Sequence, residues 1–365
     1  MKPEEILMNK KIRILVVGLG GMGSTHATAY TKLNEYEIIG FVDAMQAERA
    51  QNLAKSLKIS IPVFTNYYEA MKQLEPDAVS INTYPDTHAE YSIYAMKQGC
   101  HVFVEKPIAR TVDEAETVVN IAHDTKRKLV VGYILRQHPA WQQFIQLARQ
   151  LGKPLIMRMN LNQQSFGHEW SVHKTFIKNM PPLVDCGVHY LDIMCQITQS
   201  QPKFVQAIAA RVTDEIDPDL HNYGQLQVGF EDGSVGWYEV GWGPMISKTA
   251  YFIKDVIGPK GSVSMDKSQS NADPSDVSKH TEVNTIIIHS SETDNQGKPL
   301  HEDRLVHIED EPDHNELCKR EQEYLLRAIK EDLDLSNHWD DAVNSLKIGL
   351  AAVESYKKGM TIHFS

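Results

Sequence analysis

A chain of 365 residues is long enough for two compact domains, and its composition, 42% hydrophobic and 23% charged, is typical of a globular protein. Its formal net charge of −11 argues against a nucleic-acid-binding protein, which needs a basic surface, but not against a nucleotide held by backbone N–H groups. No apolar run reaches the roughly 20 residues of a membrane-spanning helix, and the acidic N-terminal residues do not resemble an export signal. We therefore expect a cytoplasmic protein that binds neither nucleic acid nor a membrane.

The four cysteines, Cys100, Cys186, Cys195 and Cys318, are scattered along the chain. Four cysteines could form two disulfides. However, scattered cysteines without a C-x-x-C pair, in a large chain that has no export signal, indicate free thiols.

The first third of the chain, residues 12–132, alternates short apolar runs with helix-like stretches. Val, Ile and Phe fill the runs on consecutive positions, as expected for parallel strands buried on both faces. The runs are residues 12–17, 38–42, 78–81, 101–104 and 129–131. This alternation predicts a doubly wound parallel sheet of the Rossmann type, in a domain spanning residues 1–133.

The pattern changes in the remaining residues, 134–365, which we expect to form an α+β substrate domain with a large, mostly antiparallel sheet. Tight turns joining strand-like segments favour antiparallel pairing. The final helix is expected to pack back on the first domain. In chain order, the predicted elements are a helix at about 139–151, a strand at 155–165, a helix at 182–197, strands over 204–265 with turns at 231–234 and 258–261, a polar loop at about 266–284, and helices at 314–331 and 340–358.

A glycine-rich turn, Gly18-Leu19-Gly20-Gly21-Met22-Gly23, follows the first strand and opens a helix. In dinucleotide-binding turns the first glycine makes the bend, the second lets the backbone approach the pyrophosphate, and the third allows close packing. Asp43 follows the second strand, where a carboxylate accepts hydrogen bonds from the adenosine ribose and repels a 2′-phosphate. An ordinary β-turn-α unit is the alternative. The ordered set predicts NAD binding, with NADP less favoured, and Arg49 nearby leaves use of both open.

Glu105-Lys106-Pro107 follows the strand at 101–104, so Lys106 is predicted to lie at the carboxyl edge of the sheet, where such folds bind ligands. A surface turn is the alternative. Farther along, Asp185 and His189 are spaced to share one helix face, with Asp192 one turn beyond. A histidine beside a carboxylate can accept a proton near neutral pH, although a buried structural histidine would give the same pattern.

Five motifs occur in order along the chain: Gly18-x-Gly20-x-x-Gly23, Asp43, Pro85-Asp86-Thr87-His88, Glu105-Lys106-Pro107 and Asp185-x-Gly187-x-His189-x-x-Asp192. Together, and over essentially the whole chain, they resemble the glucose–fructose oxidoreductase, inositol dehydrogenase and MocA family. The resemblance implies NAD-dependent hydride transfer at a hydroxyl of a sugar, polyol or cyclitol. A non-catalytic NAD-binding regulator, and a hydrolase or lyase that uses NAD transiently, are the alternatives.

The resemblance also implies roles for individual residues. Lys106 matches the catalytic lysine, with a cis bond to Pro107, His189 the general base, and Asp185 its substrate-binding partner. Trp170 is expected in a substrate-facing loop. Cofactor-binding residues are then Gly18, Gly20, Gly21, Met22, Gly23, Asp43, Thr83, Pro85, His88, Glu105, Lys106 and Arg136, and substrate-binding residues are Lys106, Trp170, Asp185 and His189.

Hydride transfer of this kind needs no metal, and the sixteen histidines show no H-x-x-x-H or H-E-x-x-H spacing. We therefore expect no metal site, even at His168 and His173, which flank Trp170. The chain departs from the family at Met180-Pro181-Pro182, where members often carry a Gly-Gly pair, so the substrate of any one member is not transferred to it.

Self-association, as a homodimer or homotetramer, is implied by the resemblance and by five aromatic residues in strand-like segments. If these aromatics share one open sheet face, they form an apolar patch too large for a monomer. They are Tyr223, Phe230, Trp237, Tyr238 and Trp242.

Overall fold

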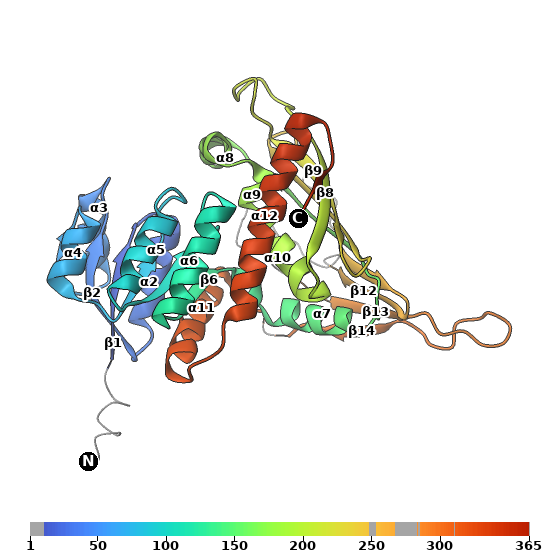
Figure 1. Ribbon diagram of the computed structural model, residues 1–365, viewed down its shortest axis with the longest axis horizontal. Helices are drawn as coiled ribbons and strands as arrows, with labels where there is room; N and C mark the ends of the chain where they lie inside the picture. The colour runs from blue at the N-terminus through green and yellow to red at the C-terminus, as the bar shows by residue number, and fades with distance from the viewer. Residues whose placement is uncertain (1–10, 248–252, 267–282, 284, 310, 365) are drawn as a thin grey trace, which may run out of the picture. The chain divides into compact units, whose positions relative to one another are not determined.

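The computed structural model describes residues 11–247, 253–266, 283, 285–309 and 311–364 (Figure 1). The chain forms two compact units, residues 1–134 with 315–343, and residues 135–314 with 344–365. The four cysteines carry thiols rather than disulfides. None of the helices in this described part is long and apolar enough to cross a membrane.

The first unit is built on a parallel sheet whose described strands number six and follow the order β3-β2-β1-β4-β5-β6. This is the order of a doubly wound dinucleotide-binding sheet, as predicted. The order reverses between β1 and β4, so ligands of such a sheet bind beyond the carboxyl ends of these two strands. The strands are β1 (Ile12–Val17), β2 (Tyr36–Val42), β3 (Val63–Phe64), β4 (Ala78–Ile81), β5 (His101–Glu105) and β6 (Leu129–Gly132).

Helices flank this sheet (Figure 1), and local sequence explains where several of them begin. The side chain of Asn66 caps one helix, and Thr111 and Glu114 form a capping box at another. One helix comes from near the C-terminus, and the Tyr36 hydroxyl donates to the carbonyl of its residue Gln322 at 2.9 Å. The helices are α2 (Gly21–Thr31), α3 (Ala47–Ser56), α4 (Tyr67–Leu74), α5 (His88–Lys97), α6 (Val112–Thr125) and α11 (His314–Lys330).

The second unit contains a mostly antiparallel sheet, as predicted, with the described strands in the order β14-β13-β12-β11-β7-β10-β9-β8-β15. The pair β7 and β10 is parallel. The predicted turns at 231–234 and 258–261 join β9 to β10 and β11 to β12. The strands are β7 (Ile156–Gln164), β8 (Pro202–Ala210), β9 (Tyr223–Phe230), β10 (Val235–Gly243), β11 (Lys254–Gly258), β12 (Gly261–Asp266), β13 (Thr285–Ser290), β14 (Arg304–His307) and β15 (Ile362–His363).

Helices of the second unit cover one face of this sheet (Figure 1). The predicted helix at 182–197 is interrupted at Cys186 and forms two helices, and one helix was not predicted at all. The loop predicted at about 266–284 falls largely outside the described residues. The helical elements are η1 (Ile134–Gln137), α7 (Pro139–Arg149), α8 (Gly167–Asn179), α9 (Pro182–Asp185) and α10 (Gly187–Thr198), and the long helix α12 (Ser336–Lys358) begins in the first unit and ends in the second.

The five aromatic residues expected on an open sheet face do not share one. Phe230, Tyr238 and Trp242 are buried in the core, because alternate residues of a strand point to opposite faces. The ring of Tyr238 stacks on Tyr190 of α10, with centroids 5.2 Å apart. Only Trp237 and Tyr223 of the five are partly exposed, so the aromatic argument for self-association is wrong.

Candidate active site

The glycine-rich turn lies at the switch point of the first sheet. Gly18 has a φ of +80°, and a Cβ built there would lie 2.7 Å from the carbonyl oxygen of Asn82, directly after β4. A Cβ at Gly23 would lie 1.8 Å from the carbonyl of Gly18. Both positions therefore require glycine for the packing of the protein itself.

Gly20 differs from Gly18 and Gly23, because a Cβ built there meets no protein atom within 4 Å. Gly20 is also the N-cap of α2, so no side chain occupies the first N–H groups of that helix. Open space over uncapped N–H groups, at the positive end of a helix dipole, fits a diphosphate. This turn could hold the pyrophosphate of a dinucleotide.

Asp43, after β2, is buried and already engaged by the protein. Its carboxylate accepts from the backbone N–H groups of Leu19, Met45 and Gln46 and from Arg49, whose guanidinium lies 2.6 Å away. Burial acts to raise the pKa of Asp43, but the Arg49 hydrogen bond and the backbone N–H groups outweigh it and lower the pKa. The carboxylate is thus ionised, as ribose binding requires.

A shallow pocket adjoins Asp43, where the adenosine end of a dinucleotide would lie. From the sequence, Arg49 was expected near Asp43, but its contact with the Asp43 carboxylate was not predicted. Its side chain is 42% exposed, so the guanidinium can exchange partners. The residues lining the pocket are Met45, Gln46, Ala47, Glu48, Arg49 and Asn52.

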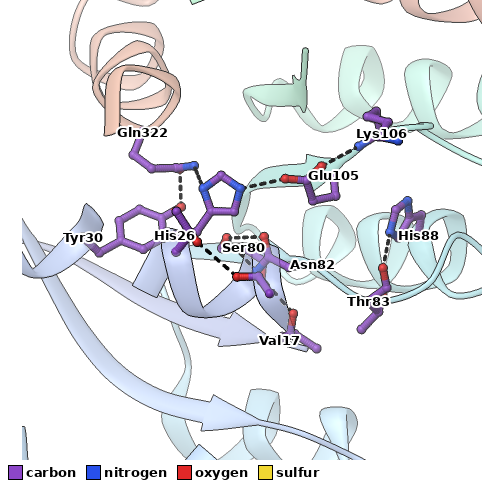
Figure 2. A network of polar contacts seen from close by, with 12 residues as sticks. Val17, His26, Tyr30, Ser80, Asn82, Thr83, His88, Glu105, Lys106 and Gln322 are labelled. Atoms are coloured by element: carbon purple, nitrogen blue, oxygen red, sulfur yellow. Dashed lines mark hydrogen bonds and ion pairs between the residues drawn. The ribbon is translucent and has the colours of Figure 1, made fainter. Parts of the chain in front are cut away.

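Lys106 follows the last residue of β5, at the carboxyl edge of the sheet, and its bond to Pro107 is cis, as expected. Figure 2 shows Glu105 between the ring of His26 and the backbone of Lys106. The Lys106 N–H donates to Glu105 Oε2 at 3.2 Å, and His26 Nε2 lies 2.7 Å from Oε1. Gly132 leaves room for this carboxylate, since a Cβ there would lie 3.2 Å from Oε2.

His88 supports the other side of Lys106. It is buried at the start of α5, with Nδ1 2.7 Å from the Pro107 carbonyl and Nε2 3.1 Å from the Thr83 carbonyl (Figure 2). Burial lowers the pKa of His88, although both carbonyls act to raise it. The neutral ring has a single N–H, so it can donate to only one of the two carbonyls, of which that of Pro107 is the nearer. Its contact with a cofactor stays a prediction.

The sequence reading missed His26, Tyr30 and Gln322, which are joined to Glu105 by hydrogen bonds. Gln322 Nε2 lies 2.9 Å from His26 Nδ1, and the Tyr30 hydroxyl donates to Gln322 Oε1. His26 lies three residues after Gly23 on α2, which is a local signal that could have been noticed. Gln322 is 296 residues from His26 in the chain, and no sequence pattern links them.

Two side chains near His26, Cys318 and Glu321, could contribute with it to a metal site on distance alone, since their ligand atoms lie within 4.8 Å of one another. However, both ring nitrogens of His26 already have hydrogen-bond partners. The donor set therefore does not fit a metal without breaking one of these contacts.

In the second unit, Asp185 is the last residue of α9 and His189 lies in the first turn of α10. Pro181 and Pro182, the family departure, form the N-cap and first residue of α9. The N–H of His189 donates to the Cys186 carbonyl at 3.2 Å. Asp185 and His189 are thus held on either side of a helix interruption, rather than on one continuous helix.

Arg136, predicted to bind the cofactor, belongs to the second unit. Its Nε lies 2.9 Å from the buried carboxylate of Asp192, and a second nitrogen contacts the other oxygen. Gln196 also donates to Asp192 at 2.9 Å. This bidentate ion pair joins η1 to α10, and a role of Arg136 in cofactor binding remains a prediction.

Trp170 lies in helix α8 and is 4% exposed, so its expected position in a loop is wrong. His173, one turn farther along, was not predicted as a site residue. Its ring stacks on Trp242 at 4.4 Å, and Nδ1 lies 3.0 Å from the Ser165 hydroxyl. Burial lowers the pKa of His173 to about 4, partly offset by the Asp185 carboxylate. His173 therefore lies in the electrostatic environment of Asp185.

The structure brings the predicted residues together as two groups, one in each unit. The first group lies around the carboxyl edge of the parallel sheet. In the second, Asp185 and His189 flank the start of α10, and Arg136 pairs with Asp192 of the same helix. The first contains the glycine-rich turn, Asp43, Thr83, Pro85, His88, Glu105 and Lys106, and the second contains Arg136, Trp170, Asp185 and His189.

Residues 12–133 match an oxidoreductase family model described as an NAD-binding Rossmann fold, and residues 147–364 match the model of the same family's C-terminal alpha/beta domain. A scyllo-inositol 2-dehydrogenase (NAD(+)) of Bacillus subtilis is 24% identical over 97% of each chain. A UDP-N-acetylglucosamine 3-dehydrogenase of Acidithiobacillus ferrooxidans is 30% identical over 56% of this chain and 61% of its own length.

Among solved structures, scyllo-inositol dehydrogenase of Lactobacillus casei with bound NAD(H) and scyllo-inositol superposes with a TM-score of 0.76, at 18% identity, over 97% of this chain and 99% of that chain. At this identity the likeness establishes the fold. The family models account for both units, and this chain belongs to the glucose–fructose oxidoreductase, inositol dehydrogenase and MocA family of oxidoreductases, with an NAD-binding Rossmann domain.

Proposed function

We propose that this protein is an NAD-dependent dehydrogenase that transfers a hydride between a hydroxyl-bearing carbon of a sugar, polyol or cyclitol and the nicotinamide. The observation that carries the proposal is Lys106, a cation at the carboxyl edge of a dinucleotide-binding sheet, with both neighbouring residues held by buried histidines. A positioned cation there can stabilise a developing alkoxide.

The residues fit NAD at two points: the open space over Gly20 and the ionised Asp43 carboxylate. NAD, when bound, supplies the hydride acceptor. In our proposal Met22 and Gly21 contribute N–H groups at the start of α2, while Thr83, Pro85, His88 and Glu105 border the nicotinamide end.

The proposed chemistry assigns one task to each catalytic group. Lys106 hydrogen-bonds the reacting oxygen and stabilises its negative charge. His189 accepts the hydroxyl proton, since a neutral imidazole is a base near neutral pH. Asp185 binds a neighbouring hydroxyl or orients His189, and Trp170 contributes to the substrate-binding surface.

Screening purified protein with NAD against a panel of sugars, polyols and cyclitols, read by NADH absorbance, tests this function. We expect net NADH formation with at least one compound of the panel. A transient use of NAD would instead change the substrate without accumulation of NADH, and product analysis by chromatography would detect it. If the substrates are unchanged while NAD binds, the non-catalytic regulator is the better description.

We also propose that the protein acts in the cytoplasm as a homodimer or homotetramer, in keeping with its family. The second sheet has helices on one face, and its other face carries exposed Ile156, Ile208 and Val235. Light scattering at micromolar concentration should give a mass above that of one 41.3 kDa chain. A monomeric mass would contradict this part of the proposal.

A further inference from the structure

A buried hydrogen-bonded chain runs from helix α11 to the residue before Lys106 (Figure 2). The Tyr30 hydroxyl donates to Gln322 Oε1, Gln322 Nε2 contacts His26 Nδ1 at 2.9 Å, and His26 Nε2 contacts Glu105 Oε1 at 2.7 Å. The other oxygen of Glu105 accepts the N–H of Lys106. All of these residues belong to the first unit.

The chain has a defined direction. Because Gln322 Oε1 accepts from Tyr30, the amide N–H of Gln322 faces His26 Nδ1, which must act as an acceptor. The proton of neutral His26 is then on Nε2 and is donated to Glu105. With the amide reversed, the lone pair of a neutral Nε2 would face the carboxylate. An ionised carboxylate only accepts, so Glu105 requires this tautomer of His26, and the hydrogen bonds of Gln322 to His26 and Tyr30 are consistent with it.

Only one of the acidic groups in and beside this network carries a negative charge. Glu321, adjacent to Gln322, is 2% exposed, and neither of its oxygens has a hydrogen-bond partner among the described residues. Burial first, and the charge of Glu105 second, raise the pKa of Glu321 well above its ordinary value. Burial likewise raises the pKa of Tyr30 and of Tyr36.

The groups facing the network from every packed element can be named. Helix α2 contributes His26 and Tyr30, β2 contributes Tyr36, and β4 contributes Ser80, whose hydroxyl is hydrogen-bonded to Tyr30. Helix α11 contributes Gln322, the neutral acid Glu321 and the buried thiol of Cys318. From β5, the ring of Phe103 packs edge-on against His26 at 4.8 Å. Glu105 is thus the anionic member, directly before the cation of Lys106.

We propose that His26 and Gln322 are positioning residues for Lys106: they hold Glu105 as an oriented carboxylate that fixes the backbone and balances the charge of the lysine. This inference rests on the proposed function of Lys106. It assigns to α11, which contributes no residue to the predicted site, control over the orientation and charge of the catalytic lysine.

The test compares variants that differ in one hydrogen bond. His26→Leu removes the donor to Glu105, whereas His26→Gln keeps an amide N–H that can reach it. Gln322→Met removes the amide that donates to His26 Nδ1. The matched control is Tyr36→Phe, which also loses a buried hydroxyl bonded to Gln322, but at its backbone carbonyl, outside the chain.

We expect His26→Leu and Gln322→Met to lower kcat by about 10- to 100-fold, as for a slightly misplaced catalytic group, with NAD affinity within a few-fold. The acid limb of the kcat–pH profile should move to higher pH, because a carboxylate that loses a hydrogen-bond donor is protonated more readily. His26→Gln should restore much of kcat, and Tyr36→Phe should leave rate and profile unchanged.

The inference is wrong if His26→Leu and Gln322→Met both keep the wild-type kcat and pH profile. It is also wrong if Tyr36→Phe loses as much kcat as these two variants. If His26→Leu does not fold, as judged by circular dichroism, His26→Gln and Tyr30→Phe decide, and Tyr30→Phe should shift the acid limb in the same direction. Lys106→Ala separates the two proposals. If it is inactive while the network variants are normal, only this inference fails, and if it is fully active, the proposed function fails.

Discussion

His88 Nδ1 lies 2.7 Å from the carbonyl oxygen of Pro107, so a buried ring on α5 holds the residue that follows Lys106. His26 holds Glu105, the residue that precedes it. A lysine side chain is long and flexible, and losing that freedom costs about 1.5–2 kcal/mol on ordering. Fixing the backbone on both sides limits where its ammonium can lie, which is what a positioned catalytic cation requires.

Lys106→Ala and His189→Ala should abolish most turnover but leave NAD binding nearly unchanged. Neither residue belongs to the glycine-rich turn, where backbone N–H groups bind the pyrophosphate in our proposal. The chemical step should fall by about 100-fold or more, as for loss of an oxyanion-stabilising or proton-transfer group. His189→Ala should also change the pH dependence of the rate. Steady-state kinetics with a substrate from the screen, beside NAD titration by fluorescence, measures both effects.

Wild-type rates in both of these variants would show that the assigned active site is wrong. A large loss of NAD affinity in either variant would indicate instead that the residue acts in cofactor binding.

Gly20→Ala and Gly23→Ala should fail in different ways, although both remove a glycine of the same motif. In Gly23→Ala the new Cβ would lie 1.8 Å from a backbone oxygen, so we expect a loss of about 1–3 kcal/mol or more in the free energy of unfolding. In Gly20→Ala the new Cβ meets no protein atom within 4 Å and should leave stability within about 0.5 kcal/mol. Gly20→Ala should nevertheless weaken NAD binding by about tenfold or more, a change of about 1.4 kcal/mol.

Thermal unfolding without NAD, followed by NAD titration, checks this pair of predictions. Unchanged NAD affinity in Gly20→Ala would mean that the pyrophosphate does not lie over the turn.

The sequence predicted the parts of the fold and site that depend on local patterns. The buried strands of the first unit are continuous apolar runs, and the glycine turn and Asp43 occupy fixed offsets from them. The loop expected around Trp170 came from the family resemblance, and the helix that the structure has there shows little apolar periodicity in the sequence. Its buried stripe is Trp170, His173 and Ile177, which follows helical spacing only if the histidine is counted as a core residue.

Long-range polar partners could not be predicted. Gln322 with His26 and Arg136 with Asp192 are joined by folding across 296 and 56 residues. Gln, Arg and Asp are ordinarily exposed and His is intermediate, so single-sequence patterns give no reason to match these residues. The predicted aromatic patch was wrong for a related reason. Residues of β10 alternate between the two faces of the sheet, and Tyr238 is buried because it packs against Tyr190 of α10, a contact that the sequence does not show.

Arg49 should control how strongly the protein discriminates against NADP. Asp43 alone would repel a 2′-phosphate, but Arg49 neutralises it and can turn to the phosphate. We expect tighter binding of NAD than of NADP in the wild type. Arg49→Ala should weaken NADP binding by roughly two- to fivefold, the range of an exposed or partly exposed ion pair, with little effect on NAD.

Arg49→Lys, which keeps the charge, is the matched control and should retain more NADP affinity than Arg49→Ala. Asp43→Asn should reduce the difference between the affinities for NAD and NADP, because it removes the negative charge that repels the 2′-phosphate. Equal affinities for NAD and NADP in the wild type would contradict the preference derived from Asp43, and an Arg49→Ala variant with unchanged NADP affinity would remove Arg49 from the adenosine site.

His173 should make the protein less stable in mild acid. Burial lowers its pKa from 6.5 to about 4, so between these pH values the unfolded chain binds a proton that the folded protein does not. The contribution of neutral His173 to the free energy of unfolding is therefore fully present above about pH 6.5 and is lost as the pH falls towards 4. A shift of this size corresponds to about 3 kcal/mol at most, at about 1.4 kcal/mol per pH unit.

His173→Gln, which keeps a polar group for the Ser165 hydroxyl but cannot titrate in this range, should flatten that part of the stability profile. Thermal unfolding followed from about pH 4 to 7 measures it. His301→Gln is the matched control, because His301 is 58% exposed and lies on the surface beside Glu292, so its loss should leave the profile unchanged. If both His173→Gln and His301→Gln keep the full acid sensitivity of the wild type, other buried groups cause the loss of stability in acid. His101, whose pKa burial also lowers to about 4, is one of them.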